Sequence, residues 1–237
     1  MRADAIILAR GGSKGVPRKN VRDVAGRPCI AWTIEHAQRS DRVDRVLVST
    51  DDSEVLAIAK SMCAETHHRS DELAHDTARV DDAAREAARC SGLGEALVIL
   101  YGNVPVRPAD LTDRAVDLLD RSVCDSVQSY CASGKHHPWW TATLSGDGSV
   151  APWEGDVLNH GVFRRQDLPP AFVPDGGVIA LSRAALNLEL EGIEPGPHAF
   201  FGRDRRGIET RDGEVIDIDT ELDLIVASTV LSGVRAC

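Results

Sequence analysis

The residues best suited to chemistry lie in a glycine-rich, cationic segment near the N-terminus. Between Leu8 and Asn20 the chain carries three glycines within five residues and four cationic side chains, which are Arg10, Lys14, Arg18 and Lys19. Glycines let the backbone approach a ligand closely and turn its N–H groups toward an anion. The cations can balance the charge that develops as a triphosphate releases pyrophosphate. The spacing fits neither the P-loop nor the dinucleotide-binding pattern, so the segment indicates an anion-binding loop of another class, with a solvated surface turn as the alternative.

A second candidate site is a pair of aspartates near the C-terminus. Asp217 and Asp219 alternate with two isoleucines, and the segment Val215–Ile218 predicts a strand. Because side chains alternate across a strand, both carboxylates would lie on one face. Adjacent carboxylates repel each other unless a cation lies between them or one is protonated, and Mg²⁺ prefers a few carboxylates together with phosphate oxygens. The pair predicts a magnesium site, with solvated acids on an edge strand as the alternative; we expect the nearby Asp223 to be only a helix residue.

The elements that must position these residues form an alternating pattern. Short apolar runs alternate with helix-like stretches, which is typical of a mostly parallel α/β sheet. Strands are predicted at Ala5–Ala9, Arg45–Thr50, Leu97–Tyr101, Ser126–Tyr130, Gly177–Leu181 and Val215–Ile218. Helices are predicted at Pro28–Arg39, Ser53–Cys63, Asp81–Cys90, Thr112–Arg121 and Glu221–Leu231. We expect one α/β domain over residues 1–237, with a Rossmann-like, mostly parallel sheet flanked by helices and the cationic loop directly after the first strand, where open α/β sheets bind ligands.

The pattern is interrupted between residues 133 and 175, where glycine, proline, tryptophan and histidine are concentrated. We interpret this stretch as an insertion. Its Trp139–Trp140 pair predicts a subunit contact, because aromatic side chains are enriched in such contacts. The histidine pairs His136–His137 and His67–His68 do not predict a zinc site, since adjacent side chains on an extended segment point to opposite sides. The insertion therefore predicts dimerisation.

Composition excludes several classes of protein. The 237-residue chain has a net charge of −10, whereas a nucleic-acid partner would require a basic surface. No apolar run approaches the roughly 20 residues that span a bilayer, and the N-terminus shows no secretion signal. The six cysteines form no CxxC pair, which is typical of reduced thiols in a cytosolic protein. We expect a cytoplasmic enzyme without a nucleic-acid or membrane partner.

Several segments are similar to those of one known family. The loop ARGGSKGVPRKN at residues 9–20 resembles the signature loop of the acylneuraminate cytidylyltransferase (CMP–sialic acid synthetase) family. Further similar segments lie at Val48–Asp52, Arg69–Thr77, Arg165–Pro169 and Val215–Thr220, so the resemblance covers roughly two thirds of the chain. It implies a homodimeric nucleotidyltransferase that joins the nucleoside monophosphate of CTP to an acidic, sialic-type sugar, releases pyrophosphate and uses Mg²⁺.

The resemblance also implies roles for individual residues. The nucleotide-binding set would be Arg10, Gly11, Gly12, Ser13, Lys14, Lys19, Asn20 and Arg69. Within it, Arg10 and Lys19 would act on the triphosphate during catalysis. The acid pair would bind the metal, and either metal activation or a carboxylate such as Asp219 would take the proton of the attacking hydroxyl.

The resemblance places the sugar site around four side chains, which are Tyr101, Arg165, Phe200 and Phe201. Arg164 and Arg165 offer a guanidinium suited to bidentate carboxylate binding, with a surface charge pair as the alternative. The two phenylalanines could form an apolar wall for the sugar, or could simply pack in the core.

Four positions depart from the family pattern. Tyr101 stands where the family has glutamine, Val104 and Val80 stand where it has serine, and Ile179 replaces a tyrosine. A buried polar group that loses its partner costs about 1–3 kcal/mol, so these changes bear on the choice of base and sugar rather than on the reaction type. Transfer from another NTP, a different acceptor such as a keto-deoxy sugar acid, and a non-catalytic nucleotide-binding relative stay open as alternatives.

Overall fold

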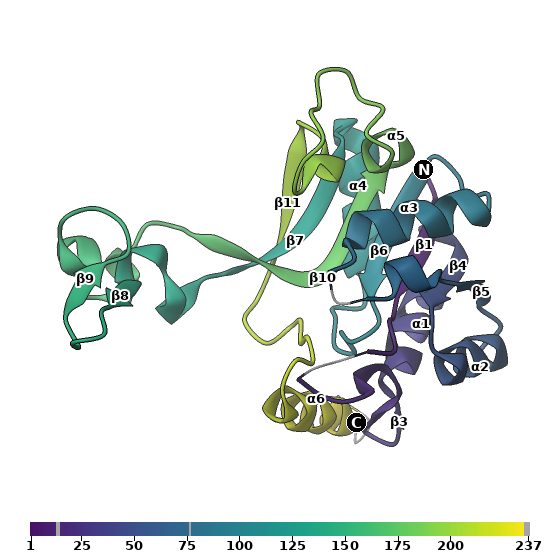
Figure 1. The fold of residues 1–237 in the computed structure, drawn as a ribbon, viewed down its shortest axis with the longest axis horizontal. Helices are drawn as coiled ribbons and strands as arrows, with labels where there is room; N and C mark the ends of the chain where they lie inside the picture. The colour runs from purple at the N-terminus through teal and green to yellow at the C-terminus, as the bar shows by residue number, and fades with distance from the viewer. Residues whose placement is uncertain (13–14, 76, 235–237) are drawn as a thin grey trace.

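The computed structural model describes residues 1–12, 15–75 and 77–234, and a seven-stranded sheet forms its centre (Figure 1). The strand order is β11-β7-β10-β6-β1-β4-β5. The strands are β1 (Ala3–Leu8), β4 (Val43–Thr50), β5 (Glu65–His68), β6 (Ala96–Tyr101), β7 (Ser126–Ala132), β10 (Phe172–Ser182) and β11 (Arg205–Thr210). Neighbouring strands are parallel except at β10, which runs antiparallel to both β6 and β7. The predicted mostly parallel α/β sheet is confirmed.

The middle of the sheet brings three strand ends together. All six residues of β1 are buried, as expected for a strand of a parallel sheet that is covered on both faces. Leu8 at the end of β1 pairs with Ser49 of β4 and with Tyr101 of β6. The three segments that follow these strands therefore leave the same edge of the sheet side by side.

Helices cover both faces of the sheet. They are α1 (Cys29–Arg39), α2 (Ser53–Ser61), α3 (Val80–Cys90), α4 (Leu111–Ser122), α5 (Arg183–Leu186) and α6 (Glu221–Val234). Apolar side chains of α1, α2 and α4 pack on one face, and those of α3 and α5 pack on the other. Helix α2 begins after Asp52, whose carboxylate accepts the backbone N–H groups of Glu54 (2.7 Å) and Val55 (3.3 Å), a common way to satisfy the free amides of a helix start.

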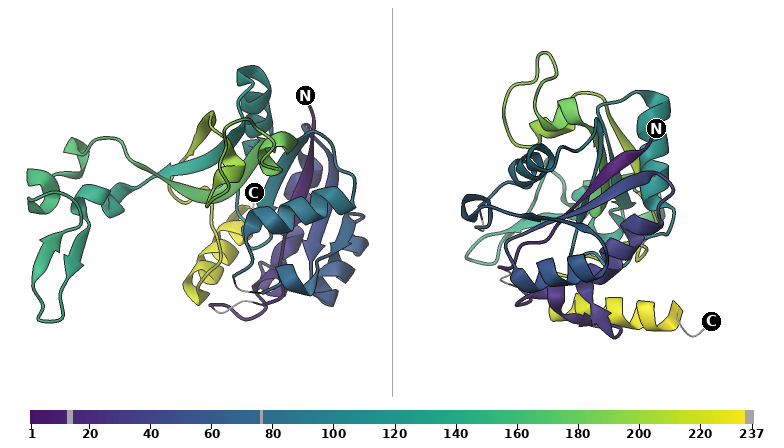
Figure 2. Two further views of the ribbon diagram at one scale, coloured as in Figure 1. Left: turned by 45° about the horizontal axis from the view of Figure 1, so that its top comes forward. Right: turned by 90° about the vertical axis from the view of Figure 1, so that its right-hand side faces the viewer.

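Helix α6 lies apart from these layers, next to the short strands β2 (Asp23–Val24) and β3 (Arg27–Pro28) (Figures 1 and 2). A third apolar cluster joins Val16 of the N-terminal loop, Ile218 beside the acid pair and Ala227 of α6. This cluster packs the two predicted chemical segments against each other.

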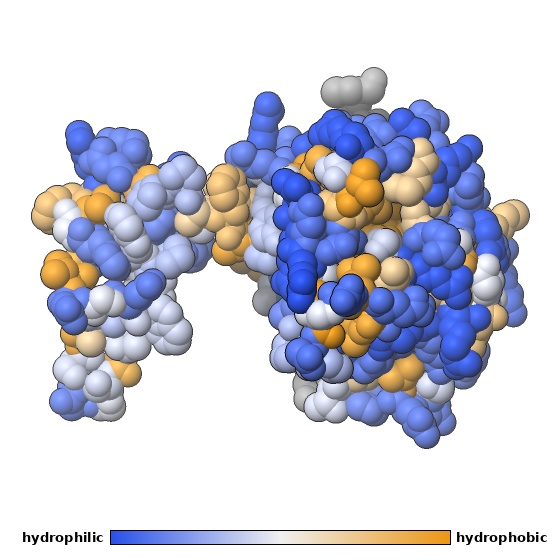
Figure 3. Space-filling view, turned by 90° about the horizontal axis from the view of Figure 1, so that it is seen from above, coloured by the Kyte–Doolittle hydropathy of each residue, from blue (hydrophilic) through white to orange (hydrophobic). Residues whose placement is uncertain are grey.

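Residues 133–171 form an arm that projects from the main body along the extended ends of β7 and β10 (Figures 1 and 3). The arm carries the hairpin of β8 (Ala142–Leu144) and β9 (Val150–Pro152). Trp139 is stacked on His160 with ring centroids 4.7 Å apart, so this tryptophan packs partly against other residues of the arm. The aromatic side chains that it exposes are Trp153, at 67%, and Phe163, at 91%. The dimerisation role of the insertion stays a prediction.

Within the central sheet and the segment of the acid pair, the structure differs from the sequence-based expectation in three ways. Strands β5 and β11 were not predicted. The predicted strand Val215–Ile218 is wrong: Ile216 forms only an isolated bridge with Val106. The physical reason is that its backbone N–H groups bond to the loop after β6, at Val106 O (3.2 Å) and Asn103 O (2.9 Å), instead of to a strand.

Within the described part of the chain, no helix is long and apolar enough to cross a membrane. The five described cysteines are all free thiols.

Candidate active site

Two cavities adjoin each other along the sheet. The smaller, of about 270 Å³, is lined by the cationic and polar side chains Arg10, Lys19, Asn20, Arg69 and Asn103. The larger, of about 680 Å³, is lined by Gln128, Tyr130, Phe200, Phe201 and Arg205 among others. Tyr101, at the carboxyl end of β6, lines both cavities. The two cavities therefore meet where the central strands end.

Arg69 is the most deeply buried cation of the smaller cavity, with 4% of its surface exposed. Its guanidinium donates to the Ser49 carbonyl (2.8 Å) and to the Ser49 hydroxyl (3.4 Å). Burial lowers the pKa of Arg69, an effect that the nearby charge of Asp51 opposes. The side chain is thus fixed in place and can present positive charge to a ligand at low entropic cost.

The N-terminal loop is held by contacts from both sides. The Asn20 amide donates to the Arg10 carbonyl (2.8 Å), and the Gly11 N–H donates to the Asp51 carboxylate (2.8 Å). This differs from the expectation that the Gly11 amide faces an anionic ligand, because an acid of the chain accepts it here. Ser13 and Lys14, two predicted nucleotide-binding residues, lie outside the described residues.

Arg18 faces away from the cavity: its guanidinium pairs with Glu54 and approaches Asp52 (3.9 Å). Gly15 lies directly against the backbone of Asp219, so that a Cβ at this position would overlap the Asp219 carbonyl oxygen. The loop and the acid pair therefore touch through a glycine, and a larger residue would push them apart.

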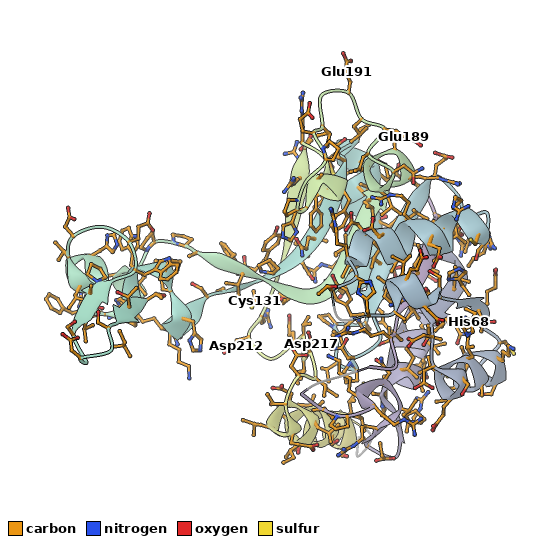
Figure 4. The ribbon with its side chains drawn as sticks, viewed as in Figure 1. His68, Cys131, Glu189, Glu191, Asp212 and Asp217 are labelled. Atoms are coloured by element: carbon orange, nitrogen blue, oxygen red, sulfur yellow. The ribbon has the colours of Figure 1, made fainter. Side chains whose placement is uncertain are left out.

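The acid pair lies on the segment between the strand ends and α6, where Figure 4 labels Asp217. The Asn103 amide donates to the Asp217 carboxylate, and Lys19 Nζ lies 2.8 Å from Asp219 Oδ1. Burial raises the pKa of Asp217 to about 6, and the negative charge of Asp219 adds to that rise. The structure thus brings the lysine of the N-terminal loop and the two acids together, although Val215–Ile218 is not a strand.

Two residues that support the acid pair were missed by the sequence analysis. Asp223 is more than a helix residue: its carboxylate accepts the backbone N–H groups of Asp219 (3.1 Å) and Thr220 (2.7 Å). The Thr220 hydroxyl in turn accepts the Asp223 N–H (3.3 Å). This reciprocal contact is a capping box, and the spacing Thr-x-x-Asp ahead of an apolar helix was the signal that could have revealed it.

Arg107 is the second missed residue. Its buried guanidinium donates to the carbonyls of Gly177 (2.6 Å) and Tyr101 (2.9 Å) and to the Thr33 hydroxyl (3.0 Å). Burial lowers its pKa to about 9, while nearby groups that include Asp217 oppose that fall. Arg107 therefore fixes the loop that carries Asn103, and no spacing or motif around it in the sequence indicated this role.

The structure brings three of the four predicted sugar-binding residues together. Tyr101, Phe200 and Phe201 line the larger cavity, and the two phenylalanine rings are stacked with centroids 4.2 Å apart. Burial raises the pKa of Tyr101 to about 12, and the charge of Asp217 contributes, so its hydroxyl stays a hydrogen-bond donor. Arg165 lies on the arm beside a separate cavity and does not reach the other three within one chain.

The acid pair can serve as a partial metal site. Among the described residues no group of three His, Cys, Asp or Glu side chains is arranged to hold a metal ion. Asp217 and Asp219 supply hard carboxylate oxygens, and burial, with the negative charge of Asp219, raises the pKa of Asp217, so a cation bound there would stabilise its charged form. Mg²⁺ is often held by one or two carboxylates that act together with substrate phosphates and water, so the donor set fits this ion.

Comparisons with known proteins identify the family. Residues 5–130 match the family model described as "Cytidylyltransferase". The chain is 46% identical over 223 residues to N-acylneuraminate cytidylyltransferase B of Danio rerio, and 33% identical over 226 residues to N-acylneuraminate cytidylyltransferase of Oncorhynchus mykiss. Each match covers 94% of this chain but only 50% and 49% of the relative, so the chain spans about half the length of these curated relatives.

A relative of similar length is pseudaminic acid cytidylyltransferase of Campylobacter jejuni (strain 81-176), which is 33% identical over 92% of this chain and 91% of its own. Among solved structures, CMP:2-keto-3-deoxy-manno-octonic acid synthetase complexed with CTP matches with a TM-score of 0.73 at 17% identity, over 98% of this chain and 99% of the other. A 4-diphosphocytidyl-2C-methyl-D-erythritol synthase from Anaerococcus prevotii matches with a TM-score of 0.64 at 13% identity, over 97% and 98%. These two likenesses show the fold. Together with the sequence matches, the geometry of the two cavities leads to one conclusion: the chain belongs to the cytidylyltransferase family.

Proposed function

We propose that the protein transfers a nucleoside monophosphate from CTP to an acidic sugar of the sialic type, with release of pyrophosphate. The observation that carries the proposal is the junction of the two cavities at Tyr101, with cations on one side and the acid pair beside it. The relatives named as cytidylyltransferases of N-acylneuraminate and pseudaminic acid support the choice of substrates.

In this proposal the smaller cavity takes the triphosphate. Arg10, Lys19 and Arg69 bind it, Asn20 holds the Arg10 backbone, and we include Gly11, Gly12, Ser13 and Lys14 among the residues that bind the nucleotide. Arg10 and Lys19 stabilise the negative charge that develops on the leaving pyrophosphate. Lys19 must leave Asp219 to do so, and an ion pair with an acid that is 70% exposed is weak enough to exchange.

Asp217 and Asp219 would hold Mg²⁺. When bound, the ion would supply positive charge at the α-phosphate and help to orient the attacking hydroxyl. The chain's own part is to keep both carboxylates in place, through Asn103 on Asp217 and through Asp223 on the Asp219 backbone. The proton of the attacking hydroxyl passes to a carboxylate oxygen of this pair, and Asp219, the more exposed acid, can release it to solvent.

The larger cavity takes the acceptor. Phe200 and Phe201 form an apolar wall, and Tyr101 divides the acceptor from the nucleotide. Arg165 would bind the sugar carboxylate only from the arm of a second copy, because it does not reach the cavity of its own chain. We therefore include a homodimer in the proposal, and we infer a cytoplasmic location from the free thiols.

Pyrophosphate release with each of the four NTPs and a panel of sialic-type, keto-deoxy and neutral sugars tests the proposal. We expect release that requires Mg²⁺, CTP and an acidic acceptor together. Full turnover after EDTA treatment would contradict the metal role. Release with neutral sugars only would contradict the acceptor class, and no release with any pair would favour a nucleotide-binding relative without activity.

A further inference from the structure

Three arginines line the larger cavity, and two of them are neutralised by acids. Arg79 binds Asp81 through two contacts of 3.0 and 2.8 Å, and Arg206 binds Asp204 at 2.7 Å. Arg205 differs: no acid among the described residues lies within ion-pair distance of it. In a chain of net charge −10, Arg205 leaves a local positive charge on a cavity wall.

Strand geometry directs Arg205 into the cavity. Arg205 pairs with Ser126 of β7, and Gly207 pairs with Gln128. Since side chains alternate across a strand, Arg205 lies on the same face as Ser126, Gln128 and Tyr130, all of which line the cavity. Arg206 pairs with Val127, so its side chain leaves the strand on the face of the buried Ile208, although the residue also borders the cavity.

The guanidinium of Arg205 is also held in one orientation. Its Nε donates to the Gly202 carbonyl (2.9 Å) and its Nη2 donates to the His198 carbonyl (3.1 Å). The guanidinium carbon lies 5.6 Å from the centroid of the Phe201 ring. An arginine has five N–H donors, so three remain for a ligand, on the Nη1/Nη2 edge that matches a pair of oxygen acceptors.

This donor edge lies far from the junction of the cavities. Ile179 of β10 pairs with Ile99 of β6 on one side and with Gln128 of β7 on the other, so Ile99 and Gln128 lie at the same level of the sheet. Two residues further along, Tyr101 is therefore level with Tyr130, which is four residues along β7 from Ser126. At the spacings of a sheet, the Cα atom of Arg205 is about 13 Å along the strands and about 14 Å across them from that of Tyr101. Arg205 therefore faces the end of the cavity that is remote from the transfer site.

Resting on the proposed function, we propose that Arg205 forms a distal subsite that binds oxygen acceptors at the end of the acceptor remote from the hydroxyl joined to the nucleotide. The subsite makes the cavity selective for extended sugar acids over compact ones. A hydrogen bond from a charged donor contributes a factor of about 10 to 100 in binding, so the preference is expected to be about tenfold or more.

The test compares two acceptors in the full-length protein: a nine-carbon sugar acid with its intact polyhydroxyl side chain, and the same acid shortened by two carbons. Values of kcat/KM are measured with CTP and Mg²⁺ for the wild type, Arg205→Gln and Arg206→Gln, and melting temperatures confirm folding. Arg206→Gln is the matched control, because it removes a neighbouring guanidinium that borders the same cavity but is already paired with Asp204. If Arg205→Gln melts early, Arg205→Lys replaces it, since lysine keeps the charge but loses the forked donor edge.

We expect the wild type and Arg206→Gln to prefer the intact acid by about tenfold or more, and Arg205→Gln to lose that preference while the KM for CTP holds. A purely structural role would lower kcat/KM for both acceptors equally and would overturn the proposal. A wild type that does not distinguish the acceptors, or a preference that survives in Arg205→Gln, would also overturn it. Absence of turnover with every acidic sugar would instead contradict the proposed function, so the two failures can be told apart.

Discussion

The two halves of the molecule differ in how their chemical side chains are held. In the part of the molecule that we propose binds the nucleotide, Arg69, Arg107 and Asp217 are buried or half-buried and form hydrogen bonds with other residues of the chain. In the part that we propose binds the acceptor, the arm exposes Phe163 and Trp153. Arg165 lies away from the other predicted sugar-binding side chains. The family model matches residues 5–130, which include Arg69 and Arg107 but not Asp217. The proposed nucleotide site is thus built within one chain, whereas the proposed acceptor site depends on the arm.

The first prediction concerns Asp217→Asn, which should affect activity most. The variant keeps an oxygen acceptor for Asn103 but loses the carboxylate charge, so kcat/KM should fall by at least about a thousandfold. Burial raises the folded pKa of Asp217 to about 6, above its ordinary 3.8, so the charged acid destabilises the metal-free fold at pH 8. This penalty disappears as the pH falls from about 6 to about 4.

Without metal at pH 8, Asp217→Asn should therefore raise the free energy of unfolding by about 1–3 kcal/mol. The gain should be absent at pH 4. Urea unfolding in EDTA at both pH values, beside a pyrophosphate-release assay, measures both effects. A variant that is less stable than the wild type at pH 8 would show that the acid is not under electrostatic strain.

The second prediction concerns Gly15→Ala, which should lower kcat/KM by about a hundredfold, since displacement of catalytic groups by about 1 Å has effects of that size. Its Cβ would push the loop away from the Asp219 carbonyl. Gly146→Ala is the matched control, because no atom lies within 4 Å of a Cβ at that position on the arm. Equal activity of the two variants would show that the loop and the acid segment need not touch.

The third prediction is that Lys19→Ala weakens CTP binding about 10- to 100-fold and changes the free energy of unfolding by less than about 1 kcal/mol. Arg18→Ala removes a cation from the same loop, but one that pairs with Glu54 outside the cavity, and should leave CTP affinity unchanged. Calorimetric titration with CTP and Mg²⁺ distinguishes the two variants. Similar losses in both would mean that the loop acts only through its total charge.

The fourth prediction has the smallest expected effect on nucleotide binding, and it distinguishes the proposed nucleotide site from the proposed acceptor site. Phe163→Asp places a charge on the most exposed aromatic of the arm and should convert a dimer to a monomer. Turnover should fall, while CTP affinity should change less than about twofold, because the nucleotide residues are held within one chain. Light scattering and calorimetry measure the two quantities. A wild type that is already monomeric at micromolar concentration would contradict the proposed dimer.

Sequence patterns predicted the parts of the fold that depend on local order. The apolar runs of β1, β4 and β6 and the amphipathic helices were recognisable because their periodicity is a property of neighbouring residues. Strand β5, ETHH, and strand β11, RRGIET, were missed because their sequences are polar and show little alternation. The alternation around Asp217 predicted a strand, but its hydrogen-bond partner is a loop, and no local pattern reveals the partner.

The sequence predicted many residues of the site but not the contacts between them. Lys19 and Asp219 are 200 residues apart in the sequence, and Asn103 and Asp217 are 114 apart, so only the folded chain shows that these pairs meet. The sequence placed Arg165 within the predicted insertion, but its spacing gave no indication that Arg205, from an unpredicted strand, would line the larger cavity.

The account's central claim is that CTP and an acidic sugar react across the junction at Tyr101. Mass spectrometry of the products formed from CTP, Mg²⁺ and a nine-carbon sugar acid tests it most directly, with pyrophosphate quantified in the same mixture. We predict a sugar–CMP conjugate in equal amount to the pyrophosphate released. Pyrophosphate with free CMP and no conjugate, or neither product at any enzyme concentration, would contradict the claim.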